Sequence, residues 1–207
     1  MDTSAASPAS KRASDILDQV KSVFASNGFE GASMQDLAQA AQMSVGNFYR
    51  YFSSKNAIVT ALVKRDLEEI ETFFEAVQSS ENPGVTFMSL LRHRIETLPF
   101  EKAALWSEVQ AASYRCPEIT TLMCAMDETV RRNVVMALVR IHGDDSAAAR
   151  EIFETRAQLL MLLVHGFAQR KYCTGADAGS EDYVALGELV LSTLHDTIFT
   201  PPALPAE

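Results

Sequence analysis

One short segment, residues 44–55, carries side chains suited to contacting a DNA duplex; it reads Ser-Val-Gly-Asn-Phe-Tyr-Arg-Tyr-Phe-Ser-Ser-Lys. An asparagine can pair with the edge of adenine and a valine can touch a thymine methyl group, so Asn47 and Val45 are candidates for base contacts. Gly46 lies between them and has no side chain, which lets the backbone approach the duplex closely. Hydroxyl and ammonium groups bind phosphate oxygens, a role that we expect for Tyr49, Tyr51 and Lys55.

Two short helices are expected to position this segment. Ser33 is placed to cap a helix at about 34–41, and Asp36, three residues later, resembles the second half of a capping box. Ser44 is placed to cap a second helix that ends near Phe52. The N-terminal amides of the helix capped by Ser33 are further candidates for phosphate contacts.

The apolar residues of this region are spaced to join the two helices through one face of each: Leu37, Ala38, Ala41, Met43 in the turn, Phe48 and Phe52. This pattern predicts a helix-turn-helix, whose second helix enters the major groove of DNA. The alternative is a helical hairpin with a merely hydrated polar face, but the aromatic pair in Tyr49-Arg50-Tyr51 favours DNA binding. The expected DNA contacts are Ser33, Met34, Gln35, Ser44, Val45, Gly46, Asn47, Tyr49, Arg50, Tyr51 and Lys55.

The run from Met34 to Lys55 reads Met-x-x-Leu-Ala-x-x-Ala-x-Met-Ser-x-Gly-x-Phe-Tyr-x-Tyr-Phe-x-Ser-Lys and resembles the N-terminal domain of the TetR family of bacterial transcriptional regulators. The resemblance extends over about residues 11–63. It implies a homodimer that binds a palindromic operator and usually represses transcription, with a separate helical ligand-binding body. It also implies phosphate contacts for Tyr49 and Lys55, and base reading by the variable positions 45–47.

One residue departs from the family pattern, because Gln42 stands where the family usually has glycine. If the backbone there has a positive φ, a residue other than glycine is tolerated at a modest cost. We therefore interpret Gln42 as a local penalty that leaves the fold intact.

Composition and charge are those of a soluble globular protein of one or two domains. The chain has 207 residues, 47% of them hydrophobic, and a net charge of -9. Residues 1–65 contain seven basic and five acidic residues, an excess of +2, whereas the remainder has 11 basic and 22 acidic residues, or -11. This asymmetry suggests a polyanion-binding head on an acidic body, although chance clustering gives the same numbers.

Helical periodicity continues through most of the chain and predicts an all-α protein of about nine helices. The first helix carries an apolar stripe that includes Ile16, Val20 and Phe24 and stops at Gly28. The later helices are expected near Ser54–Val77, 84–97, 100–114, 118–141, 146–172 and 181–199. We divide the chain into a disordered tail (1–10), a helix-turn-helix domain (11–63), a ligand-binding and dimerisation domain (64–200) and a second disordered tail (201–207).

The segment Leu159–Val164 is apolar on every side of a helix, so it must be buried on every side. We expect helices 146–172 and 181–199 of two chains to form a four-helix interface with two-fold symmetry. The alternative is a central helix in a monomeric bundle.

An adaptable apolar pocket for a small apolar or aromatic effector is expected in the acidic body. Its candidate lining residues are Phe87, Met88, Leu91, Arg94, Trp106, Gln110, Tyr114, Met123, Met126, Met136 and His165, with Arg94, Gln110 and His165 as polar anchors. Each apolar member is equally compatible with plain core packing.

Other classes of protein find little support. The sequence has no constellation for catalysis, no metal-ligand spacing among its four histidines and no cofactor motif, so we expect neither an enzyme nor a cofactor. Three cysteines without a CxxC fit a reduced cytoplasmic protein, in which Cys116 and Cys124 are either buried and inert or form a thiol sensor. No secretory signal or membrane span is expected. The alternative to a repressor is an all-helical module that binds a hydrophobic molecule or a protein without binding DNA.

Overall fold

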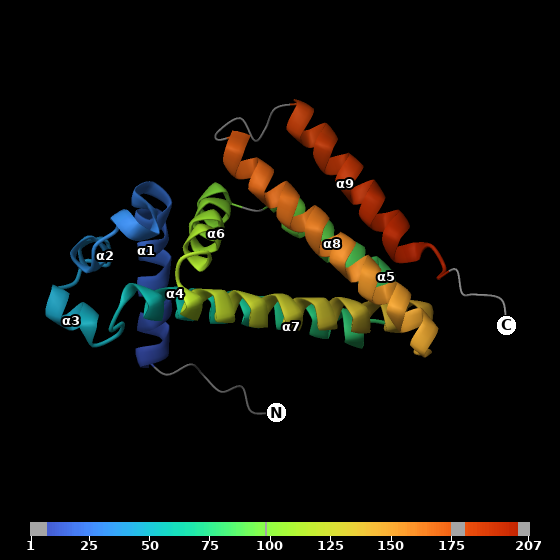
Figure 1. Ribbon diagram of the computed structural model, residues 1–207, viewed down its shortest axis with the longest axis horizontal. Coiled ribbons are helices and arrows are strands. Elements are labelled where there is room, and N and C mark those ends of the chain that lie inside the picture. Colours follow the sequence, from blue (N-terminus) through green and yellow to red (C-terminus); the bar gives the residue numbers. More distant parts are fainter. Residues whose placement is uncertain (1–7, 98, 175–180, 203–207) are drawn as a thin grey trace. The chain divides into compact units, whose positions relative to one another are not determined.

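A computed structural model describes residues 8–97, 99–174 and 181–202 of the chain (Figure 1). Over these residues the chain forms nine helices and no strand, which confirms the predicted all-α class. The helices are α1 (Pro8–Gly31), α2 (Met34–Ala40), α3 (Val45–Tyr49), α4 (Lys55–Ser79), α5 (Pro83–Thr97), α6 (Phe100–Ser113), α7 (Pro117–His142), α8 (Ala147–Thr174) and α9 (Glu181–Phe199).

The chain divides into two compact units. The N-terminal unit comprises the chain up to Arg65 together with Ala104–Met123, and the C-terminal unit comprises Asp66–Ala103 and the chain from Cys124 onward. Three helices, α4, α6 and α7, contribute residues to both units. The association of residues 104–123 with the N-terminal helices is a long-range feature that the sequence pattern did not indicate.

The apolar stripe predicted on α1 forms the centre of the N-terminal unit. Ile16, Val20 and Phe24 are completely buried, as are Phe48 of α3 and Ile58 of α4. Burying a large apolar side chain contributes about 1.5–3 kcal/mol relative to leaving it in water. This core therefore holds α3 in place from behind.

Gly28 interrupts α1 with a φ of 72°, a left-handed conformation that favours glycine, as expected for a helix stop. The backbone N–H of Phe29 then donates to the Glu108 carboxylate at 3.0 Å. A Cβ atom at position 28 would lie only 3.0 Å from the same carboxylate oxygen. The end of α1 is thus fixed against α6 within the N-terminal unit.

The C-terminal unit is held together by α5, α8 and α9. Phe87, Phe153 and Leu194 are buried in its core. Gly84 lies beneath the ring of Phe199, where a Cβ atom would overlap the ring. The rings of Phe167 and Tyr183 stack at 4.7 Å between α8 and α9.

The ends of two elements differ from their predicted positions. Helix α3, the second helix of the predicted helix-turn-helix and hence its recognition helix, ends at Tyr49 and not near Phe52. The N–H groups of Arg50 and Tyr51 bond to carbonyl groups only three residues back, which ends the α-helical pattern. The predicted inert burial of cysteine is wrong for Cys124, which is exposed, while Cys116 is half-buried. The predicted tail at 203–207 lies outside the described residues, as does most of the tail at 1–10.

Candidate nucleic-acid interface and C-terminal cavity

The predicted capping box at the start of α2 is present. The hydroxyl oxygen of Ser33 accepts a hydrogen bond from the Asp36 N–H at 3.1 Å, and the Asp36 carboxylate accepts one from the Ser33 N–H at 2.9 Å. The Ser33 hydroxyl also donates to this carboxylate, at 2.6 Å, and this bond together with the one from the Ser33 backbone N–H lowers the pKa of Asp36 below its ordinary 3.8. Because the box uses the amides of Ser33 and Asp36, those of Met34 and Gln35 are left for an external phosphate group.

The turn between α2 and α3 explains the unusual glutamine. Gln42 has a φ of 55°, in the left-handed region. Its N–H bonds to the carbonyl of Gln39 at 2.9 Å, and the N–H of Met43 bonds to the carbonyl of Ala38 at 2.9 Å. The backbone therefore adopts the conformation that glycine favours, at the cost of a close contact between the Gln42 Cβ atom and the backbone.

The recognition helix α3 has two different faces. Phe48 is 0% exposed, and its ring lies 6.0 Å from that of the buried Phe52. On the other side Val45 and Tyr49 are exposed, Tyr49 by 48%. Ser44 caps this helix, since its hydroxyl oxygen accepts from the Asn47 N–H at 3.3 Å. A helix with an anchored apolar face thus presents its polar and aromatic face outward.

All eleven expected DNA contacts lie at the surface of the N-terminal unit. Met34 and Lys55 are half-buried, and the other nine are exposed: Ser33, Gln35, Ser44, Val45, Gly46, Asn47, Tyr49, Arg50 and Tyr51. No heavy atom lies within 4 Å of the position that a Cβ atom of Gly46 would take. The backbone of α3 is therefore open to close approach at this residue.

Lys55 also has an internal role that the sequence did not suggest. Its ammonium group donates to the carbonyl oxygens of Phe29 at 2.7 Å and Glu30 at 3.1 Å, and lies 4.9 Å from the centre of the Phe29 ring. The start of α4 is thereby fixed to the end of α1. An ammonium group has three N–H donors, so one donor remains for a phosphate oxygen.

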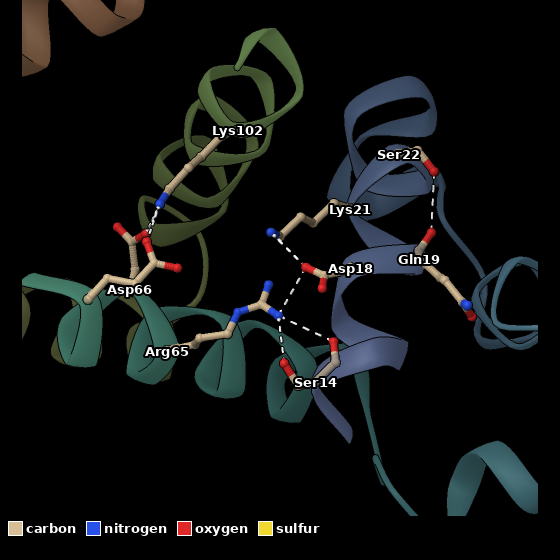
Figure 2. A network of polar contacts seen from close by, with 9 residues as sticks. Ser14, Asp18, Gln19, Lys21, Ser22, Arg65, Asp66 and Lys102 are labelled. Carbon is tan, nitrogen blue, oxygen red and sulfur yellow. Dashed lines mark hydrogen bonds and ion pairs between the residues drawn. The ribbon is translucent and has the colours of Figure 1, made fainter. Parts of the chain in front are cut away.

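Basic residues of α1 and α4 also bond within the N-terminal unit (Figure 2). The Arg65 guanidinium donates to the carbonyl and hydroxyl oxygens of Ser14, both at 3.3 Å, and pairs with Asp18 at 3.1 Å. Lys21 pairs with the same carboxylate at 3.0 Å. Of the seven basic residues of the head, Arg65 thus joins α4 to α1, while Lys21 pairs within α1.

A cavity of about 300 Å³ lies within the C-terminal unit, bordered by α4, α5, α6, α7 and α8. Five of the eleven predicted pocket residues line it: Phe87, Leu91, Arg94, Met126 and His165. The prediction missed other lining residues, among them Ile70, Phe73, Phe74, Leu160, Met161 and Val164. The spacing of Ile70, Phe73 and Phe74 along α4 was the available signal, because it marks one apolar face of that helix.

The other six predicted pocket residues do not line this cavity: Met88, Trp106, Gln110, Tyr114, Met123 and Met136. Trp106, Gln110, Tyr114 and Met123 belong to the N-terminal unit, where Tyr114 is 82% exposed. Met136 is an exposed residue of α7. Helical periodicity identifies the apolar face of a helix but does not show whether that face borders a cavity or packs in the core. These six residues therefore could not be distinguished by sequence from those that line the cavity.

Helices α8 and α9 pack together and leave apolar side chains exposed. Leu162 is 68% exposed and Leu189 is 65% exposed, and Leu159 and Val184 are also exposed. Leu160 and Met161 are buried, so the apolar segment 159–164 has one face inside the chain and one face uncovered.

Other kinds of site are not found in the described part of the chain. No group of three or more histidine, cysteine or acidic side chains is arranged to hold a metal ion among residues 8–97, 99–174 and 181–202. Within the same ranges, no helix has the length and apolar character needed to cross a membrane.

Comparisons with known proteins agree with this geometry. Residues 16–62 match the profile described as "Bacterial regulatory proteins, tetR family". The regulator UidR of Escherichia coli K12 is 29% identical over 112 residues, which are 52% of this chain and 55% of UidR, so the chain spans about half the length of this relative. The repressor KstR of Mycolicibacterium smegmatis is 33% identical over 61 residues, or 30% of each chain.

Solved structures resemble the chain over most of its length. GusR of Salmonella enterica is 21% identical with a TM-score of 0.72, over 93% of this chain and 97% of that one. FadR of Bacillus subtilis, solved in complex with stearoyl-CoA, is 17% identical with a TM-score of 0.67, over 89% and 98%. The segment 16–62, with its capped helix-turn-helix, therefore belongs to the TetR family of bacterial regulatory proteins, and the chain shares the fold of these solved structures over most of its length.

Proposed function

We propose that this chain is a transcriptional repressor that binds a palindromic operator as a homodimer and is released from it by a small, largely apolar effector. The observation that carries the proposal is the two-faced recognition helix α3. Phe48 and Phe52 anchor it from behind, while Val45, Asn47 and Tyr49 are exposed. An exposed valine and tyrosine on a helix of this size are explained by a surface that becomes covered when DNA binds.

The proposed division of labour follows the predicted domains. Residues 11–63 bind DNA, and residues 64–200 bind the effector and the second chain. Asn47 and Val45 read bases, whereas Tyr49, Arg50, Tyr51, Lys55 and the amides at the start of α2 hold phosphate groups. Because phosphate contacts release counterions, the affinity falls steeply as the salt concentration rises.

The uncovered face of α8 and α9 supports a homodimer. Leu159 and Leu162 of α8 and Val184 and Leu189 of α9 are exposed apolar side chains that a second copy of the same pair of helices can cover. An isologous interface between two such pairs makes a four-helix arrangement with two-fold symmetry. That symmetry presents two recognition helices to the two halves of a palindrome.

The cavity of the C-terminal unit supports effector control. Its walls are mainly apolar, with Phe73, Phe74 and Phe87 among them. An effector that binds one conformation of the dimer better than the other shifts the equilibrium between them, with a typical coupling of about 1–3 kcal/mol. We place this activity in the cytoplasm, where the DNA is, and assign no catalytic step to the chain.

Selection of bound sequences from a randomised duplex pool tests the DNA-binding part. Asn47→Ala changes the selected sequence, whereas Tyr49→Phe lowers the affinity for all sequences to a similar extent. Tyr114→Phe is the matched control, since it removes the hydroxyl group of another exposed tyrosine of the N-terminal unit outside α2 and α3. If the chain retains no duplex from the pool or from fragmented genomic DNA, the proposal is refuted, and the chain is instead a helical binding module.

A further inference from the structure

The cavity of the C-terminal unit has an aromatic end and a polar end. The rings of Phe73, Phe74 and Phe87 contact one another, with centres 5.0 to 5.9 Å apart. Arg94 follows Phe87 by seven residues along α5, which separates the two by roughly 10 Å at 1.5 Å per residue. Four polar lining residues lie near one another at this second end: Lys102 links Glu69 and, through Asp66, Arg94, and His165 is close enough to Arg94 to feel its charge.

The two basic side chains at the polar end, Lys102 and Arg94, differ in how closely they pair with carboxylates. Lys102 forms ion pairs with the buried Asp66 and, at 2.7 Å, with Glu69, so that its charge is matched by two carboxylates (Figure 2 shows the pair with Asp66). Arg94 has its nearest carboxylate oxygen, on Asp66, at 3.8 Å, which is too far for a hydrogen bond. Among the described residues, the five N–H donors of Arg94 have no hydrogen-bond acceptor within bonding distance, although the side chain lines the cavity.

His165 of α8 adds a neutral donor to the same end. Burial lowers its pKa, and the nearby charge of Arg94 lowers it further, while Asp127 of α7 acts in the opposite direction. The imidazole is therefore uncharged at neutral pH and offers one N–H donor and one acceptor. The charged groups around it are Glu69 of α4, Arg94 of α5, Lys102 of α6 and Asp127 of α7.

We propose that the cavity binds a monocarboxylate with an aromatic body, with the ring against the three phenylalanines and the carboxylate on the guanidinium of Arg94 and the N–H of His165. A guanidinium group fits a carboxylate through two parallel hydrogen bonds. Among the described residues, Glu69 is the one acidic residue that lines the cavity, and its carboxylate already pairs with Lys102 at 2.7 Å, so a cationic ligand finds no equivalent partner in the lining. This inference rests on the proposed function, in which the monocarboxylate is the effector.

Calorimetry on the full chain without DNA tests the ligand class. The probes are benzoate, 2-naphthoate and biphenyl-4-carboxylate, each compared with its primary amide, which has nearly the same shape and no charge. At least one acid is expected to bind tenfold or more tightly than its amide. Arg94→Gln should remove that advantage and leave the amide within twofold, whereas Arg94→Lys, which keeps the charge but not the planar fork, should retain part of it.

Arg92→Gln is the matched control on the same helix, because Arg92 is exposed, pairs with Glu96 and Glu188 and does not line the cavity. It should leave both affinities unchanged. Equal binding of acid and amide, an acid affinity unaffected by Arg94→Gln, or no binding of any of the three acids would overturn the inference. DNA binding is measured separately on each variant, so a chain that takes the acid through Arg94 but binds no duplex refutes only the proposed function.

Discussion

Two neighbouring residues of the recognition helix allow its anchoring and its DNA-contacting roles to be separated. Phe48 is 0% exposed and packs beside Phe52, whereas Tyr49, the next residue, is 48% exposed. We predict that Phe48→Ala and Tyr49→Ala both weaken operator binding but differ sharply in their effect on the stability of the N-terminal unit.

The expected magnitudes follow from burial. Truncating a fully buried phenylalanine to alanine costs about 3–5 kcal/mol, from lost transfer free energy and the cavity left behind. Replacing an exposed tyrosine changes the free energy of unfolding by no more than about 0.5 kcal/mol, and alanine's higher helix propensity offsets part of that. The two variants should therefore differ by at least about 2.5 kcal/mol.

The chain contains its own reporter for this measurement. Trp106 is the single tryptophan, and it belongs to the N-terminal unit through α6. Its fluorescence during urea unfolding follows this unit, and linear extrapolation gives the free energy of unfolding of each variant. Fluorescence anisotropy with labelled duplex measures DNA binding in the same samples.

Two results would refute the reasoning. If Tyr49→Ala destabilised the Trp106 transition as much as Phe48→Ala, Tyr49 would be part of the core and α3 would not have a free outer face. If Phe48→Ala cost less than about 1 kcal/mol, the phenylalanine pair would not anchor the helix.

Three further predictions concern the turn, the cap and the exposed apolar face. Gln42→Gly should raise the free energy of unfolding of the N-terminal unit by about 1 kcal/mol, because glycine adopts the left-handed conformation without steric cost. The control Gln39→Gly, inside α2, should lower it by roughly 0.5–1 kcal/mol. Equal effects of the two substitutions in urea unfolding would exclude strain at Gln42. Asp36→Asn should lower the free energy of unfolding of the unit by its full amount above about pH 5, and this difference from the wild-type chain should shrink as the pH falls below 3.8. The reason is that the hydrogen bonds from Ser33 lower the pKa of Asp36 and favour its charged form. A difference that does not change with pH in acid titrations would contradict this. Leu162→Glu should convert the proposed dimer to a monomer in analytical ultracentrifugation, whereas Val85→Glu, at an equally exposed position of α5, should not; loss of the dimer in both variants would argue against the α8 and α9 interface.

Local rules were sufficient for the helix-turn-helix. The capping box of Ser33 and Asp36 and the cap at Ser44 depend on bonds between residues three apart, so sequence spacing defines them. The positive φ of Gln42 was raised only as a condition, on the ground that the resembled family usually has glycine there, and the structure has this conformation. The apolar stripe of α1 followed from helical periodicity, because only one face of that helix can be buried at once.

Long-range packing was not accessible in the same way. The hydrogen bond between Phe29 and Glu108 joins residues far apart in the chain, and no local pattern links them. The same limitation affected the cavity, since the side of α4 that carries Phe73 and the side of α5 that carries Phe87 meet only in three dimensions. The internal bonds of Lys55 were missed because its spacing fits a phosphate contact equally well.

The order of two adjacent residues in α4 has a consequence for how this protein can change over time. Arg65 bonds to Ser14 and Asp18 in one unit, and Asp66, the next residue, bonds to Lys102 in the other. Each set of bonds lies inside its own unit, so exchanging one of these two side chains removes bonds from one unit and leaves those of the other unit in place. Two neighbouring positions of a single helix can therefore change independently of each other.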